Sequence, residues 1–75
     1  MVGLDGETLA EAAAEFNRYN DRQIVIDDPA LGQERLVGYF RATDPESFAR
    51  AAANTLGAQV SFGDRELRLS PPARS

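Results

Sequence analysis

The chain has 75 residues, a formal net charge of −4, no cysteine and no histidine. A chain of this length forms one small domain that buries only about 60% of the surface that its unfolded form exposes. The missing cysteine excludes disulfides and thiolate metal sites, and the missing histidine removes the commonest metal ligand and acid–base group. All 8 basic residues are arginines, dispersed among 12 acidic residues, which argues against a surface for nucleic acid or an anionic membrane.

The first elements are a short strand at residues 2–4 and a helix that begins after Thr8. Thr8 and Glu11 have the spacing of a capping box, in which each side chain bonds the backbone of the other residue. Five residues at helical spacing are predicted to form the buried face: Leu9, Ala12, Ala13, Phe16 and Tyr19. We expect the helix to stop at Asn20-Asp21.

The next segment is predicted to hold two strands separated by a tight helical turn. Gln23–Ile26 is short and β-branched, and Asp27-Asp28-Pro29 ends it, because proline cannot donate to a sheet. Residues 30–33 form the turn, with Leu31 pointing inward. Residues 35–41 form the second strand, with Leu36 and Phe40 on one face and Val37 and Tyr39 on the other.

The second helix is predicted from Asp44 as the cap and Pro45 at the first helical position to Gly57, which tolerates the left-handed end. Its expected inner face is Phe48, Ala51, Ala52, Thr55 and Leu56. Residues 59–62 and 66–69 then form a hairpin around Gly63-Asp64. In this hairpin Val60 and Phe62, and likewise Leu67 and Leu69, alternate as expected for a half-buried sheet.

The element order β-α-β, β-α-β, β predicts an α+β fold, with the two helices sandwiched between two small sheets. Residues 1–70 form the single domain and residues 71–75 a disordered tail. Ten apolar residues are predicted to form the core: Leu9, Phe16, Ile24, Ile26, Leu36, Phe40, Phe48, Leu56, Val60 and Leu69.

Catalytic chemistry has little support in the sequence. Serines are present, but there is no histidine or lysine to activate one, and no glycine-rich phosphate loop. Asp27, Asp28 and Glu34 could supply oxygen ligands to calcium, yet their spacing is not that of a calcium loop and a strand-ending turn explains them. We therefore expect no enzyme activity, no cofactor, no metal and no small-molecule substrate. Tyr39 and Phe40 between arginines lack the signature of an RNA-binding sheet.

Two groups of residues leave a structural and a partner-binding interpretation open. Tyr19 can complete the buried helix face while Arg18 pairs with Glu15, or both residues can belong to a protein-binding surface. Val37 and Tyr39 either face solvent or are buried on the second side of a strand that lies between two layers.

Several short motifs make the chain resemble the C-terminal periplasmic domain of FecR-type anti-sigma regulators. They extend from Leu4 to Leu69: Gly6-Glu7-Thr8-Leu9, Glu15-Phe16-Asn17-Arg18-Tyr19-Asn20, Ile24-Val25-Ile26, Asp28-Pro29-Ala30-Leu31, Gly38-Tyr39-Phe40 and Asp44-Pro45-Glu46-Ser47-Phe48. The Asn-Arg-Tyr-Asn element combined with the strand glycine is the most specific part. The resemblance implies the fold of the short N-terminal domain of secretins and TonB-dependent transducers, with two β-α-β units whose helices lie between two sheets.

In that family the domain lies in the periplasm, as part of a single-pass inner-membrane protein. It receives a signal from the N-terminal signalling domain of a TonB-dependent outer-membrane transducer and controls an extracytoplasmic-function sigma factor, typically for iron uptake. The sequence has no membrane helix, signal peptide or cytoplasmic segment, so we interpret it as an excised fragment. It would reach the sigma factor only through the missing cytoplasmic segment.

The alternatives are the signalling domain of the transducer itself and a ring-building domain of a secretin, which would self-associate. Partner binding is predicted to use an exposed strand edge that is extended by backbone pairing. The residues predicted to bind the partner are Val37, Tyr39, Arg41 and, at the periphery, Arg18.

Overall fold

The computed structural model describes residues 2–72, which form five strands and three helices. The elements are β1 (Val2–Thr8), α1 (Leu9–Asn17), β2 (Gln23–Ile26), α2 (Pro29–Gly32), β3 (Arg35–Phe40), α3 (Pro45–Leu56), β4 (Gln59–Phe62) and β5 (Glu66–Ser70). Residues 71 and 72 have no regular structure, and the rest of the predicted tail, 73–75, lies outside the described residues.

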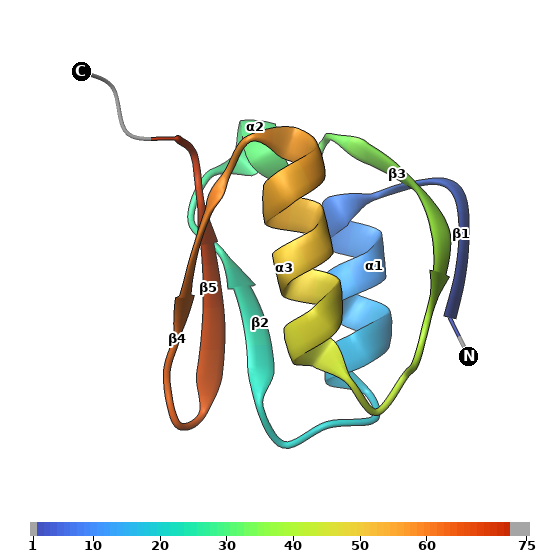
Figure 1. Cartoon of the computed structure of the whole chain (residues 1–75), viewed down its shortest axis with the longest axis vertical. Coiled ribbons are helices and arrows are strands. Elements are labelled where there is room, and N and C mark those ends of the chain that lie inside the picture. The colour runs from blue at the N-terminus through green and yellow to red at the C-terminus, as the bar shows by residue number, and fades with distance from the viewer. Residues whose placement is uncertain (1, 73–75) are drawn as a thin grey trace.

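The strands form two separate sheets, with α1 and α3 between them (Figure 1). β1 and β3 pair antiparallel, whereas the second sheet has the order β2-β5-β4, with β5 parallel to β2 and antiparallel to β4. Each β-α-β half therefore contributes one strand to each sheet. This arrangement confirms the predicted α+β sandwich.

The helix boundaries follow from the local signals in the sequence. The hydroxyl of Thr8 accepts the Glu11 amide and the Glu11 carboxylate accepts the Thr8 amide, so the predicted capping box is present. At α3 the carboxylate of Asp44 accepts the amide and the hydroxyl of Ser47. Gly57 ends this helix with φ 68°, a left-handed conformation in which a side chain would be strained.

The core is apolar and centres on three phenylalanines. Phe16 and Phe48 stack with ring centroids 4.5 Å apart, and Phe40 meets Phe48 edge-on at 5.2 Å. Of the ten predicted core residues, Ile26, Phe40, Leu56 and Val60 are partly buried at the margin and the others are fully inside. Val2, Leu4 and Leu67 are buried although the prediction left them out.

Three details of the prediction are wrong. α1 ends at Asn17, so Tyr19 lies beyond the helix and is 57% exposed instead of completing its buried face. The buried face of α3 is Pro45, Phe48, Ala49, Ala52 and Ala53, and Thr55 faces solvent. β1 runs from Val2 to Thr8 and is longer than the predicted strand at residues 2–4. Phe62, which the predicted core does not include, is 42% exposed on the edge strand β4.

Replacing Phe48 by alanine should remove the ring that Phe16 and Phe40 both contact. A phenylalanine-to-alanine change in a packed core costs about 3–5 kcal/mol. A domain of this size has a free energy of unfolding of roughly 4–11 kcal/mol, so the loss is a large part of it. Chemical denaturation followed by circular dichroism measures this. Val37→Ala, at an exposed apolar site, should stay within about 0.5 kcal/mol of the parent.

The two helix caps predict a loss of stability in acid. Backbone and side-chain hydrogen bonds from Thr8 lower the pKa of Glu11, and those from Ser47 lower the pKa of Asp44. A carboxyl with a lower pKa in the folded state stabilises the protein above its unfolded pKa, and this contribution disappears as pH falls through the folded value.

We therefore expect the urea midpoint to decrease as the pH is lowered from about 5 through the acid range in which these two carboxyls take up protons. The double variant Glu11→Gln, Asp44→Asn keeps hydrogen-bond acceptors that do not titrate, so its midpoint should fall less over the same range. An identical pH dependence in the parent and the variant would show that other groups dominate.

Candidate protein-interaction surface

The solvent side of the β1–β3 sheet carries the most exposed apolar side chains of the described residues. Val37 is 77% exposed and Tyr39 is 81% exposed, whereas Leu36 and Phe40 on the same strand turn toward the helices. The two residues therefore face solvent, and the interpretation that both sides of this strand are buried is wrong. We call Gly3, Asp5, Val37 and Tyr39 the outer β1–β3 face.

Gly3 allows Tyr39 to lie across the neighbouring strand. The two residues are paired in register, and a Cβ atom on Gly3 would stand 3.1 Å from the Tyr39 ring. Most side chains at this position would displace the ring, so the glycine gives a flat aromatic surface. A flat, exposed tyrosine supplies a large contact area at little cost in conformational entropy, which suits a protein interface.

The predicted residues Arg41 and Arg18 lie at two borders of this region. Arg41 directly follows β3 and is exposed. Arg18 is the C-cap of α1, and its guanidinium lies 3.5 Å from the Glu15 carboxylate, so the predicted ion pair is present. An exposed pair of this kind adds little to stability and leaves Arg18 available to a partner.

Tyr19 extends the outer β1–β3 face toward α1. Together with Glu15, Val2, Gly3 and Ala42 it lines a depression of about 340 Å³. The Tyr39 ring lies against the same glycine, Gly3. The structure thus places both tyrosines of the chain around Gly3. The sequence does not indicate that Tyr19 and Tyr39 lie near the same glycine, because no local signal shows that the end of α1 lies beside the start of β1.

The outer face of the three-stranded sheet is polar by comparison. Arg68 on β5 forms ion pairs with Asp27 and Glu66, and Ser70 donates to Asp27 at 3.0 Å. Gln59 and Ser61 lie beside these residues on β4. The outer sides of the two sheets therefore differ within residues 2–72, and of these two sides it is the outer β1–β3 face that presents an aromatic ring to solvent.

The acidic residues considered as calcium ligands have structural contacts. Asp27 binds Arg68 and Ser70, and Asp28 caps α2 by accepting the Ala30 amide at 3.3 Å. Within residues 2–72 there is no group of three or more acidic, histidine or cysteine residues placed to hold a metal ion. No helix in this part of the chain is long and apolar enough to cross a membrane.

Two asparagines of the Asn-Arg-Tyr-Asn element hold the end of α1 in place. The Asn17 amide accepts the Ile24 N–H at 2.7 Å and donates to the Ile24 carbonyl at 3.2 Å, so it binds the backbone edge of β2. Asn20 donates to the carbonyls of Phe16 and Ala42, at 2.9 and 2.6 Å. These contacts fix α1 against β2 and against the segment that leads into α3.

Comparison with known proteins supports the fold. No family model matches the chain, and no curated protein matches it. A solved structure of the Salmonella SPI-1 type III secretion injectisome basal body, with the proteins InvG, PrgH and PrgK, contains a chain whose fold is similar. The TM-score is 0.78 at 11% sequence identity, over 93% of this chain and 15% of that one. The chain thus shares its fold with one small part of a much longer chain of that basal body.

Replacing Asn17 by aspartate tests the contact with β2. The carboxylate can still accept the Ile24 amide, but it places a negative oxygen beside the Ile24 carbonyl where the amide donated a hydrogen bond. Leaving such a partly buried group without its partner should cost about 1–3 kcal/mol in free energy of unfolding. Asn54→Asp, the same change at an exposed position, should have little effect. Equal denaturation curves for the two variants would contradict this role of Asn17.

Proposed function

We propose that this domain recognises another protein through the outer β1–β3 face. The exposure of Val37 and Tyr39 is the observation that carries the proposal. Most apolar side chains of this small domain are buried, whereas Val37 and Tyr39 are exposed together on one side of the β1–β3 sheet. An exposed apolar surface of this kind is suited to contact with another protein. Arginine and tyrosine are the residues enriched at the energetic centres of interfaces, and Arg41 and Tyr19 border this face.

The partner that the sequence motifs favour is the N-terminal signalling domain of a TonB-dependent outer-membrane transducer. The domain would then act in the periplasm as the recognition part of a FecR-type regulator. The sigma factor would be reached through a segment outside this chain, and the output would be iron-uptake genes. The free edge of β3 beside the outer face supports this proposal, because an edge strand can accept an extended segment by backbone pairing. In this proposal the domain has no enzymatic role.

A ring-building domain of the secretin type is the second candidate. The structural similarity to a chain of the injectisome basal body favours this candidate over the first. The regulator candidate rests on short sequence motifs alone. The two candidates differ in the partner. A regulator domain binds a different protein, whereas a ring-building domain binds further copies of itself in a head-to-tail manner.

Binding between this chain and a purified transducer signalling domain, measured by calorimetry, tests the proposal. In the double variant Tyr39→Ala, Arg41→Ala the affinity should drop at least about tenfold, as expected for residues at the centre of an interface. Arg65→Ala is the matched control, since it removes one exposed arginine from the β4–β5 hairpin far from this face. It should bind like the parent.

Thermal melts decide whether a loss of binding is specific. Unchanged melting of the double variant locates the loss at the surface, and a sharply lowered melting temperature would show that Tyr39 and Arg41 support the core. Binding to no transducer domain, combined with higher-order self-association that Tyr39→Ala abolishes, would select the ring-building candidate. A chain that does neither would refute recognition through this face.

A further inference from the structure

The free edge of β4 has two residues with unpaired backbone groups. At the hairpin the Gly63 amide donates to the Glu66 carbonyl at 2.8 Å, which fixes the alternation along the antiparallel pair. The backbone groups of Ser61 and Gln59 therefore form hydrogen bonds with β5. The N–H and C=O groups of Val60 and Phe62 point away from β5, toward the open edge of the sheet. These four groups can receive a further strand.

The edges at β2 and β1 carry protection that β4 lacks. The Asn17 amide occupies the backbone groups of Ile24 on β2. On β1 the register shifts between Asp5 and Glu7, and the Glu7 carboxylate accepts the Asp5 amide at 2.7 Å. β4 consists of Gln59, Val60, Ser61 and Phe62, with no charge, proline or bulge, which are the usual devices against edge pairing.

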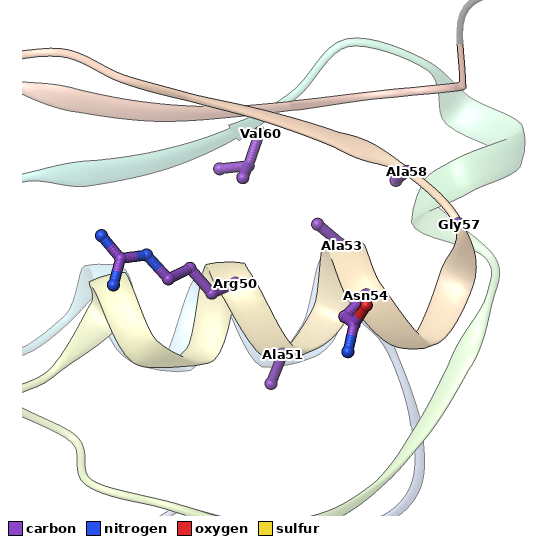
Figure 2. Close-up of a pocket in the computed structure, with 7 residues that line it drawn as sticks. All are labelled: Arg50, Ala51, Ala53, Asn54, Gly57, Ala58 and Val60. Carbon is purple, nitrogen blue, oxygen red and sulfur yellow. The ribbon is translucent and has the colours of Figure 1, made fainter.

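A groove of about 640 Å³ runs between β4 and α3 (Figure 2). Ala53 and Val60 point toward each other across it, and Gly57 and Ala58 close one end. Phe62 lies on the same inner face of the sheet as Val60, since both pair with buried leucines of β5. The Arg50 guanidinium carbon lies 5.0 Å from the centre of the Phe62 ring and covers it only in part.

We propose that β4 pairs antiparallel with β4 of a second copy of this chain, about a two-fold axis at Ser61. In this register Val60 of one copy exchanges two backbone hydrogen bonds with Phe62 of the other, so all four open groups are used. The exposed Phe62 ring of each copy then stands beside Val60 of the other copy and enters the groove. The two three-stranded sheets become one continuous sheet.

A second copy fits this edge better than other occupants for two reasons. Val60 and Phe62, whose backbone groups are free, lie symmetrically on either side of Ser61. In an antiparallel pair of two β4 strands, each of these residues therefore meets the other. The two-fold axis also places the exposed Phe62 ring of one copy beside Val60 of the other copy, where the groove between β4 and α3 can cover it. The four residues of β4 carry no charge, so the two paired strands themselves bring no like charges together. This dimer does not depend on either function proposed above.

Disulfide cross-linking tests the register, because the chain has no cysteine of its own. Ser61 would face Ser61 of the other copy as a non-hydrogen-bonded pair, with Cα atoms about 4.5 Å apart, within the range that a disulfide spans. Ser61→Cys should therefore form a covalent dimer under mild oxidation faster than Gln33→Cys, an exposed control position at the C-cap of α2. Equal rates for the two variants would refute the register.

Charge substitutions test the same contact without a covalent bond. Ser61→Lys and Ser61→Glu should each reduce the dimer seen by sedimentation of a concentration series, because like charges then face each other across the axis. An equimolar mixture of the two variants should restore it. A parent chain that stays monomeric at every concentration, or a mixture that does not recover, would overturn the proposal. Tyr39→Ala should leave this dimer intact, which separates it from ring building through the outer β1–β3 face.

Discussion

The stacking of Phe16 on Phe48 is the contact on which the rest of the structure depends. Helices as short as α1 and α3 do not persist alone in water, so each needs an apolar neighbour. The two rings join the first β-α-β half to the second, with Phe40 against their edge. Because each half gives one strand to each sheet, each sheet forms only when the two halves come together, as they do at this contact. The fold should therefore be cooperative despite its small size.

The core contains one layer of helices between two sheets. Each sheet is therefore covered by helices on one side only, and its other side faces solvent. The sheets are covered on their inner sides, and the described residues 2–72 contain no further element for their outer sides. On the three-stranded sheet the outer side is occupied by the ion pairs of Arg68. On the two-stranded sheet it carries Val37 and Tyr39 instead. The two outer faces therefore differ in polarity because of their side chains, and the less polar face, on β1–β3, is the one better suited to contact with another protein.

The elements could be predicted because their signals are local, whereas the errors arise where distant contacts decide. Thr8, Asp44 and Gly57 define helix ends through neighbours three or four residues away. In α3 the buried face could be predicted only in part: Phe48 and Ala52 are buried as expected, whereas Thr55 is not. The run of alanines at 51–53 gives the same hydropathy on three successive faces and so does not define the face fully. Packing against Phe16 selected the face that contains Phe48 and Ala52. The early end of α1 likewise depends on Asn17 and Asn20 reaching other segments.

The interaction surface could be predicted in part for the same reason. Alternation along β3 separated Val37 and Tyr39 from Leu36 correctly, but only the three-dimensional structure shows which side the helices cover. The approach of Tyr19 to Gly3, and the exposure of Phe62, depend on segments that are far apart in sequence.

The Asn-Arg-Tyr-Asn element illustrates why fold and function need separate evidence in this chain. Asn17 and Asn20 bind backbone groups of other segments, so they serve the architecture whatever partner is bound. A similarity that rests on such residues, or on a shared fold at 11% identity, carries information about the scaffold. Recognition must be carried by side chains that the fold does not require, because only these can change without loss of stability. By that criterion the exposed residues of β3 and β4, above all Tyr39 and Phe62, are the side chains best placed to carry the proposed recognition.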